Sequence, residues 1–343
     1  MTRFPAPARL FVGSYARSGG EGLYPLWVNE QLQLGQPFQQ APNCSFAAWS
    51  PHLRLGYFVD EQQQGLLHLC QLEADGWRSV GSYASGGAAP CYVALDNTAT
   101  RAAVANYASG SVALLTLDRG TGRPVDEPQI WQGSGGGPVA GRQDGPHLHC
   151  ALFDQGWLYA VDLGSDRIFA FDLARARTLE HPVVAFSALP GTGPRHLVLH
   201  SHLPTAYLVS ELASTVSVLD RVGPCFLLRA SHATQPSAFA DDNLGGHLTM
   251  NRAGDRLYVS NRGHDSIAVF AIGRSGDLKL LQHAPSGGAH PRSVILLEDE
   301  GLCLVANEKG ENIALMDIGP DGLLGEVRQQ LAVPGAAFLF RAS

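Results

Sequence analysis

A strand–loop–strand pattern recurs six times along this chain and constrains its fold more than any other feature. Each copy places two short apolar runs on either side of a polar turn. A further apolar run precedes each copy and a more variable segment follows it, so one unit holds four short strands in roughly 50 residues. The copies are GYFVDEQQQGLL (56–67), AAVANYASGSVALL (102–115), LYAVDLGSDRIFAF (158–171), AYLVSELASTVSVL (206–219), LYVSNRGHDSIAVF (257–270) and CLVANEKGENIALM (303–316). Four-stranded units repeated at this period are typical of a β-propeller.

The number of blades follows from the chain length of 343 residues. With a weaker first copy at 10–26, seven units of this size account for the chain. The first unit lacks a leading strand, and the strand-like run AAFLFRA at 336–342 is left over. We therefore expect an all-β fold, a seven-bladed propeller of four-stranded antiparallel blades, closed by pairing of the N- and C-terminal strands, because closure removes exposed edges. Residues 1–343 are expected to form a single domain.

Composition agrees with this fold and argues against several classes of function. The chain contains 39 glycines and 21 prolines, and only 16% of its residues are charged, which favours short strands and turns over long surface helices. No uninterrupted apolar stretch of about 18 residues is present, so no membrane span is predicted. A net charge of −7 argues against nucleic acid as a partner.

The N-terminus and the cysteines indicate the compartment. The first residues, MTRFPAPARLFVGSY, contain no apolar segment followed by a small-residue cleavage site. Six cysteines are scattered without a C-x-x-C pair, which is typical of reduced, mostly buried thiols. We therefore predict a cytoplasmic protein.

Antiparallel order predicts which loops share a face of the propeller. If the four strands of a blade are called A to D from the axis outward, the residues that begin strand A and those at the B–C tip crowd around one mouth. Histidines and arginines gather at these positions, whereas the A–B turns of the opposite face carry Asp, Asn, Gly, Pro and Ser. The candidate site residues at the mouth are His147, His149, Arg195, His196, Glu211, His247, Arg262 and Arg292.

Four of these residues break the repeat rather than follow it, namely Arg195, Glu211, Arg262 and Arg292. A structural demand recurs in every blade, so a residue present in one or two copies is a stronger candidate for a ligand role. Asp and Asn at the first B–C position recur and are expected to cap the hairpins. Two simpler interpretations stay open: Glu211 and Arg262 hold equivalent positions in consecutive copies and could form a plain ion pair, and His196 and His247 could be structural.

The His147-Leu148-His149 spacing could place two imidazoles on one face of a strand. No third ligand has a matching spacing, however, and nearby arginines would oppose a cation. We predict no metal and no cofactor.

At these residues the chain resembles the seven-bladed lactonase propellers, a family that includes bacterial propeller-type 6-phosphogluconolactonase and fungal carboxymuconate lactonising enzyme. The matching stretches include GPHLHCALF, GPRHLVLH and LYVSNRGHDSIAVF, and with weaker copies the resemblance covers nearly the whole chain. The motifs are specific to the family but discriminate poorly between its members' reactions. The resemblance implies an active-site set of a histidine, two arginines and a glutamate. Carried onto this sequence, the set falls on His147 or His149, Arg195, Glu211 and Arg262.

The chain also departs from the family pattern around the mouth. It reads Pro90-Cys91-Tyr92 and Pro291-Arg292-Ser293 where many relatives carry a histidine, and Gly-Gly-His at 245–247 where bulkier residues are usual. The loop GSGGGPVAGRQDG at 133–145 is unusually rich in glycine. These departures leave the physiological lactone open, as well as whether the loop is a lid.

The function expected from residues and resemblance together is lactone hydrolysis. The predicted substrate is a small anionic sugar-acid lactone, and we expect 6-phosphogluconolactone of the pentose phosphate pathway. We expect His149 or Glu211 as general base, Arg195 and Arg262 as oxyanion or anion contacts, and His147, His196, His247 and Arg292 as further substrate contacts. The alternatives are a carboxymuconate-type cycloisomerase and a non-catalytic binding platform. The sequence does not indicate an oligomeric state.

Overall fold

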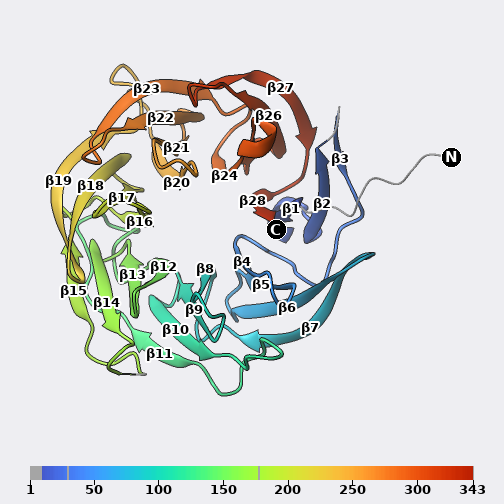
Figure 1. The fold of residues 1–343 in the computed structure, drawn as a ribbon, viewed down its shortest axis with the longest axis vertical. Helices are drawn as coiled ribbons and strands as arrows, with labels where there is room; N and C mark the ends of the chain where they lie inside the picture. Colours follow the sequence, from blue (N-terminus) through green and yellow to red (C-terminus); the bar gives the residue numbers. More distant parts are fainter. Residues whose placement is uncertain (1–9, 29–30, 177, 343) are drawn as a thin grey trace.

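Seven four-stranded antiparallel sheets surround a central axis in the computed structural model, which describes residues 10–28, 31–176 and 178–342 (Figure 1). In six of the sheets the first strand in the sequence lies at the axis and the last at the rim, whereas in the seventh β28 lies at the axis and β3 at the rim. The predicted seven-bladed propeller is confirmed. The strands are β1 (Leu10–Ser14), β2 (Leu23–Val28), β3 (Leu32–Leu34), β4 (Ala47–Ser50), β5 (Leu55–Asp60), β6 (Leu66–Glu73), β7 (Gly76–Ala84), β8 (Pro90–Leu95), β9 (Arg101–Asn106), β10 (Ser111–Thr116), β11 (Gln129–Gln132), β12 (Leu148–Asp154), β13 (Trp157–Asp162), β14 (Arg167–Asp172), β15 (Val183–Ser187), β16 (Pro194–Leu199), β17 (Thr205–Ser210), β18 (Thr215–Val222), β19 (Cys225–Ala233), β20 (Leu244–Met250), β21 (Arg256–Arg262), β22 (Ser266–Ile272), β23 (Leu278–Pro285), β24 (Pro291–Leu297), β25 (Leu302–Asn307), β26 (Asn312–Ile318), β27 (Leu324–Ala332) and β28 (Ala336–Arg341).

Helical structure in the described residues is limited to two short 3₁₀ turns, η1 (Ala16–Ser18) and η2 (Glu298–Glu300). Within the same residues, no helix has the length and apolar character needed to cross a bilayer.

The ring is closed by strands from the two ends of the chain, as the leftover run at the C-terminus predicted. Strand β28 is the innermost strand of its blade and pairs antiparallel with β1, with Leu10 opposite Arg341 and Val12 opposite Leu339. Strands β2 and β3 complete that blade. Closure through backbone hydrogen bonds removes the edge that an open array of blades would expose.

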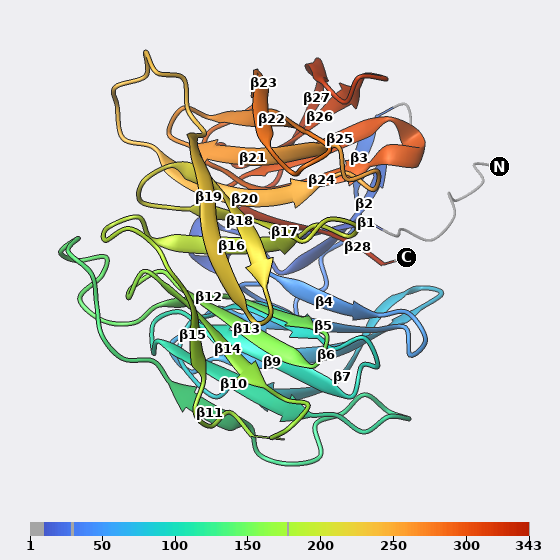
Figure 2. The ribbon, with the colours of Figure 1, turned by 60° about the vertical axis from the view of Figure 1, so that its left-hand side comes forward.

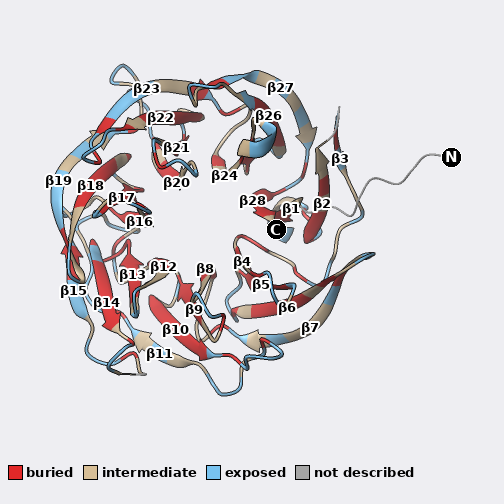
Figure 3. Ribbon diagram, in the orientation of Figure 1, coloured by how far each residue is buried: buried red, intermediate tan, exposed pale blue. Residues whose placement is uncertain are grey.

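Burial falls from the axis to the rim (Figure 3). Inner strands lie between neighbouring blades, so both of their faces are covered and they consist of continuous apolar runs; β17, for example, is buried at every position. Outer strands have one solvated face, and β27 accordingly alternates between covered and exposed residues. Seen from the side, β19 crosses its inner neighbours β16 to β18 at an angle, as the twist of a blade requires (Figure 2).

Three tyrosines of the repeat tie their blades to the blades that follow. The side chains of Tyr57, Tyr207 and Tyr258 are buried, and each hydroxyl donates to a backbone carbonyl in the outer turn of the following blade. The three bonds are Tyr57 to Gly122 at 2.7 Å, Tyr207 to Gly276 at 2.9 Å and Tyr258 to Gly322 at 2.7 Å. A buried phenol needs such a partner, so the repeated tyrosine fixes the spacing between blades on the face opposite the mouth.

The recurring Asn and Asp at the B–C tips anchor the mouth loops. Asn106, Asn261 and Asn307 are fully buried, and their side-chain amides donate to the backbone carbonyls of Ser85, Thr234 and Ser286 respectively. Each carbonyl belongs to the segment that leads from the preceding blade into the blade of the asparagine. These bonds hold the B–C tips against the connecting segments around the mouth. The capping role expected for the recurring residues is seen at Asp162, which accepts from the backbone N–H of Gly164 in its own hairpin at 2.9 Å.

A belt of aromatic rings crosses the axis where the inner strands begin. Phe46 lies 4.7 Å from Phe338 and 3.9 Å from Tyr92, between ring centroids, and Tyr92 in turn lies 5.4 Å from His196. Next to the belt remains a cavity of about 10 Å³, which is room for about one water molecule. The belt therefore forms a floor under the mouth.

Candidate active site

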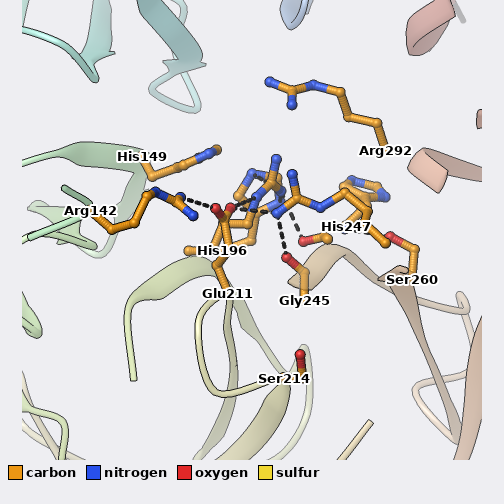
Figure 4. A network of polar contacts seen from close by, with 12 residues as sticks. Arg142, His149, His196, Glu211, Ser214, Gly245, His247, Ser260 and Arg292 are labelled. Atoms are coloured by element: carbon orange, nitrogen blue, oxygen red, sulfur yellow. Dashed lines mark hydrogen bonds and ion pairs between the residues drawn. The ribbon is translucent and has the colours of Figure 1, made fainter. Parts of the chain in front are cut away.

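The centre of the mouth is the carboxylate of Glu211, which follows β17 at the tip of the β17–β18 hairpin (Figure 4). Its Oε2 atom lies 3.0 Å from Nε of Arg195 and 2.6 Å from Nη2 of Arg262. Its Oε1 atom accepts from Nη2 of Arg142. Only 2–5% of the Glu211, Arg195 and Arg262 side chains is exposed. Three guanidiniums thus share one buried carboxylate.

β-Bulges aim the inner-strand residues at the mouth. The register of β16 with β17 slips between Pro194 and His196, which makes Arg195 the extra residue of the bulge. His149 in β12 and Arg292 in β24 are extra residues in the same way. A bulge rotates the side chain out of the regular alternation of a strand. The candidates at the start of strand A therefore turn toward the mouth instead of packing between blades.

The paired glycines that depart from the family pattern bring backbone carbonyls to both buried arginines. Gly245 O accepts from Arg262 Nη2 at 2.8 Å, and Gly246 O accepts from Arg195 Nη1 at 2.9 Å. A Cβ at position 246 would lie 2.3 Å from Ser260 Oγ, and one at 245 would lie 2.6 Å from Ser210 O. The glycines are thus required by the close approach of β20 to its neighbours.

The two histidines of the P-H-x-H motif have different surroundings. His149 is buried and points toward Glu211 (Figure 4), and its Nδ1 atom has no hydrogen-bond partner within the described part of the chain. His147 is half-buried and stacks on Tyr107 with ring centroids 4.5 Å apart, and its Nδ1 lies 2.9 Å from the Tyr107 backbone oxygen. The geometry therefore favours His149 as the histidine that acts at the cluster.

The other two predicted histidines lie along the floor. The ring of His196 is 5.3 Å from that of His149 and 5.6 Å from that of His247, between centroids. His247 also accepts a hydrogen bond on Nδ1 from the backbone N–H of Val294 in the next blade, at 3.2 Å. That contact fits the structural role left open for His247, whereas His196 lies directly beside the Arg195 guanidinium at 3.0 Å.

Burial and the arginines set the protonation states. Burial, followed by the charge of Arg195, holds the pKa of His149 and of His196 well below the ordinary value and lowers the pKa of His247 to about 4. All three imidazoles are therefore neutral near pH 7. Burial and the neighbouring Arg262 lower the pKa of Arg195 to about 10, which leaves this guanidinium charged.

Glu211 is ionised in spite of its burial. Burial alone would raise its pKa, but the charges of Arg262 and Arg195 outweigh that effect and hold the pKa well below the usual range. A carboxylate stabilised in this way is a weak proton acceptor. It instead fixes the positions of the guanidiniums.

The fourth predicted arginine, Arg292, lies across the mouth from Glu211 in separate surroundings (Figure 4). Its Nη1 is 3.5 Å from Glu308 Oε2 and its Nη2 is 3.7 Å from Glu61 Oε2. Glu61 also accepts from the buried Tyr15 hydroxyl at 2.7 Å, and the Arg292 guanidinium lies 5.3 Å from the centroid of the Tyr15 ring. Arg292 is thus neutralised by its own carboxylates, which the sequence had not singled out.

Sequence reasoning missed Arg142 and the contacts of Tyr107. Arg142 belongs to the glycine-rich connection between β11 and β12, and its Nη2 lies 3.5 Å from the Tyr107 hydroxyl in addition to its bond with Glu211. One signal was available, because Arg142 is the only Lys or Arg within 133–145. The loop lies outside the repeat, so comparison of the copies could not align it with the other site residues.

Comparison with known proteins gives consistent results. A family model described as "Lactonase, 7-bladed beta-propeller" matches residues 9–340. The chain is 29% identical to the 6-phosphogluconolactonase of Bacillus subtilis (strain 168) over 320 residues, which cover 90% of each chain. It is also 29% identical to the 6-phosphogluconolactonase of Formosa agariphila over 348 residues, covering 96% of this chain and 98% of the relative.

Among solved structures, the periplasmic gluconolactonase of Pseudomonas aeruginosa matches with a TM-score of 0.88 at 24% identity, over 96% of this chain and 97% of that one. At this identity the likeness concerns the fold alone.

Proposed function

This chain belongs to the lactonase family of seven-bladed β-propellers, and from that premise we propose that it hydrolyses 6-phosphogluconolactone to 6-phosphogluconate, as a carboxylic ester hydrolase of the pentose phosphate pathway. The names of the two relatives that align over most of the chain support this substrate. The mouth supports it independently through its charge.

The observation that carries the proposal is the excess of positive charge around Glu211. Three guanidiniums, from Arg142, Arg195 and Arg262, surround a single carboxylate in the buried mouth. A phosphorylated lactone brings about two negative charges, which this excess would neutralise. Because the protein as a whole carries a net charge of −7, such a substrate needs a local cationic site of this kind.

In the proposed reaction a water molecule attacks the lactone carbonyl carbon and transfers a proton to His149. His149 suits this role because its imidazole is neutral and its Nδ1 is unpartnered among the described residues, whereas guanidiniums occupy both oxygens of Glu211. The lowered pKa of His149 makes it a weaker base than a free imidazole. The guanidiniums of Arg195 and Arg262 stabilise the negative charge on the carbonyl oxygen. The bond between the carbonyl carbon and the ring oxygen then breaks as His149 gives its proton to the ring oxygen and returns to its neutral form. Glu211 holds the two arginines in place.

We further propose that the protein is cytoplasmic and that residues 1–343 form one domain. All six cysteines are free thiols, and five of them are buried, which fits a reducing compartment.

The test is turnover of freshly prepared 6-phosphoglucono-δ-lactone above its spontaneous hydrolysis, measured beside glucono-δ-lactone and a carboxymuconolactone. Preference for the phosphorylated lactone is expected. Turnover of the carboxymuconolactone alone would favour the cycloisomerase, and failure on all three would leave a binding platform.

Two variants test the assignment of the base. Replacement His149→Gln should lower kcat by roughly 10²- to 10⁴-fold, the usual contribution of a general base. The matched replacement His147→Gln should lower it less, because His147 packs on Tyr107. Equal losses in the two variants would contradict the assignment.

A further inference from the structure

The two oxygens of the Glu211 carboxylate have unequal partners. Oε2 contacts the two buried guanidiniums of Arg195 and Arg262. Oε1 has Arg142 as its sole hydrogen-bond partner among the described residues. If Arg142 moved, Oε1 would be free while the rest of the cluster stayed intact.

Arg142 also differs from the other two arginines in its freedom to move. Its side chain is 34% exposed, against 2% for Arg195 and 5% for Arg262. Apart from Glu211, the only hydrogen-bond partner of its side chain among the described residues is the Tyr107 hydroxyl, at 3.5 Å. A guanidinium held by so few bonds can reorient toward an incoming anion, which then replaces the carboxylate as its partner.

The backbone that carries Arg142 is fixed, in contrast. The neighbouring Gln143 is 1% exposed, and its side-chain amide donates to Leu163 O at 2.8 Å. Its backbone N–H donates to Val139 O at 2.8 Å, and its backbone oxygen accepts from Gly137 N at 2.9 Å. The glycine-rich connection therefore presents Arg142 from a rigid base, so that the side chain rather than the loop is the part able to move.

We propose that Arg142 is a substrate-specificity residue. Its guanidinium moves away from Oε1 of Glu211 and binds the phosphate of the lactone. This movement frees Oε1 for a hydrogen bond with the substrate or with water. The inference rests on the lactonase function proposed above. A phosphate offers several charged oxygens to a guanidinium and can be bound bidentately, whereas Glu211 offers Arg142 one oxygen. The freed Oε1 accepts a hydrogen bond from a lactone hydroxyl or from the attacking water. A lactone without phosphate lacks the group that draws Arg142 away, so Glu211 stays masked.

The experiment is replacement of Arg142 by alanine, with kcat and KM measured for 6-phosphoglucono-δ-lactone and for glucono-δ-lactone. The phosphorylated lactone should lose roughly 10- to 100-fold in kcat/KM, mainly through KM, as expected for loss of a charged hydrogen bond. The unphosphorylated lactone should gain, because Oε1 is no longer masked. The Arg142→Lys variant keeps the charge but not the bidentate geometry. Its kcat/KM for the phosphorylated lactone should therefore lie between the values of the wild-type protein and of Arg142→Ala.

The matched control is Arg167→Ala. Arg167 is an exposed arginine at the start of β14, beside the same loop near Gly135, and it does not contact Glu211. Its replacement should leave the ratio of the two kcat/KM values unchanged. Equal losses on both lactones in Arg142→Ala would overturn the proposal, since that result indicates that Arg142 only holds Glu211 in place.

A binding measurement separates this inference from the proposed function. Calorimetric titration with 6-phosphogluconate should show at least 10-fold weaker binding to Arg142→Ala than to the wild-type protein. If the wild-type protein hydrolyses neither lactone, the proposed function fails, and equal binding of 6-phosphogluconate by both proteins would then overturn the role of Arg142 as well.

Discussion

The two sides of the mouth use the same residue types to opposite effect. Around Glu211, three guanidiniums meet one carboxylate, so positive charge is in excess. Around Arg292, the carboxylates of Glu61 and Glu308 face the guanidiniums of Arg292 and Arg17, so the formal charges cancel. Glu61, Glu211, Arg262 and Glu308 hold equivalent tip positions in different blades. The comparison shows that the local sum of charge, rather than the presence of an arginine, makes one side suitable for an anion.

The largest effect should come from Glu211→Gln, which removes the carboxylate that Arg142, Arg195 and Arg262 share on the cation-rich side of the mouth. Three buried or partly buried guanidiniums would then lack compensation, and we expect a loss of about 3 kcal/mol in the free energy of unfolding. Turnover should fall at least 100-fold because Arg195 and Arg262 lose their positions. Urea denaturation and lactone kinetics measure the two effects. The control is Glu308→Gln on the balanced side of the mouth, which is formed by Arg292, Glu61 and Glu308. It should lower the free energy of unfolding and the turnover less than Glu211→Gln does. Equal losses in the two variants would contradict the comparison of the two sides.

The second prediction contrasts the two arginines at opposite sides of the mouth. Arg262→Ala should lower kcat/KM for the phosphorylated lactone roughly 10- to 100-fold, because a charged hydrogen bond to the carbonyl oxygen of the substrate is lost. Arg292→Ala should lower kcat/KM less, since Glu61 and Glu308 already occupy its guanidinium. Steady-state kinetics on the phosphorylated lactone measure both values. A larger loss of kcat/KM in Arg292→Ala would place the anion on the side of Arg292.

The third prediction concerns pH and the neutral histidines of the floor. Burial, with the charge of Arg195 next, lowers the pKa of His247 to about 4 and holds the pKa values of His149 and His196 well below normal. Between about pH 6.5 and 4 the unfolded chain therefore binds protons on these residues that the native protein does not bind. For each of these histidines, the free energy of unfolding falls by up to about 1.4 kcal/mol for every unit by which the pH is lowered in this range. Above about pH 6.5 they contribute nothing.

Urea denaturation at pH 7.5 and 5.5 measures this effect, and stability should be lower at pH 5.5. The variant His247→Gln should show a smaller difference between the two pH values than the wild-type protein. A stability that does not change over this interval would show that the histidines beside the cation-rich side are not held neutral.

The smallest effect is expected for Arg17→Ala on the balanced side. The Arg17 side chain is 61% exposed and its Nη2 lies 3.0 Å from Glu308 Oε1, so its ion pair is screened by water. Stability should change by less than about 1 kcal/mol, and KM should stay at the wild-type value. A large rise in KM would mean that Arg17 takes part in binding the substrate.

Much of the architecture could be predicted from the sequence because it depends on repeated, local patterns. The apolar runs of β17 and its counterparts predicted the inner strands, and the unpaired run at 336–342 predicted the closure that β28 and β1 make. The repeat also placed Arg195, Glu211 and Arg262 on one face, because the antiparallel order of strands fixes which loops meet there.

The tertiary structure decided the chemistry of that face. The turn of Arg195 and His149 toward the mouth depends on bulges that only the register of paired strands defines. The third arginine at Glu211 comes from a loop outside the repeat, and the neutralisation of Arg292 depends on Glu308 of its own blade and Glu61 of another blade. Charge balance and pKa values are sums over neighbours in space. A repeat in the sequence therefore determines where side chains converge, whereas the distances between them determine which remain available for a ligand.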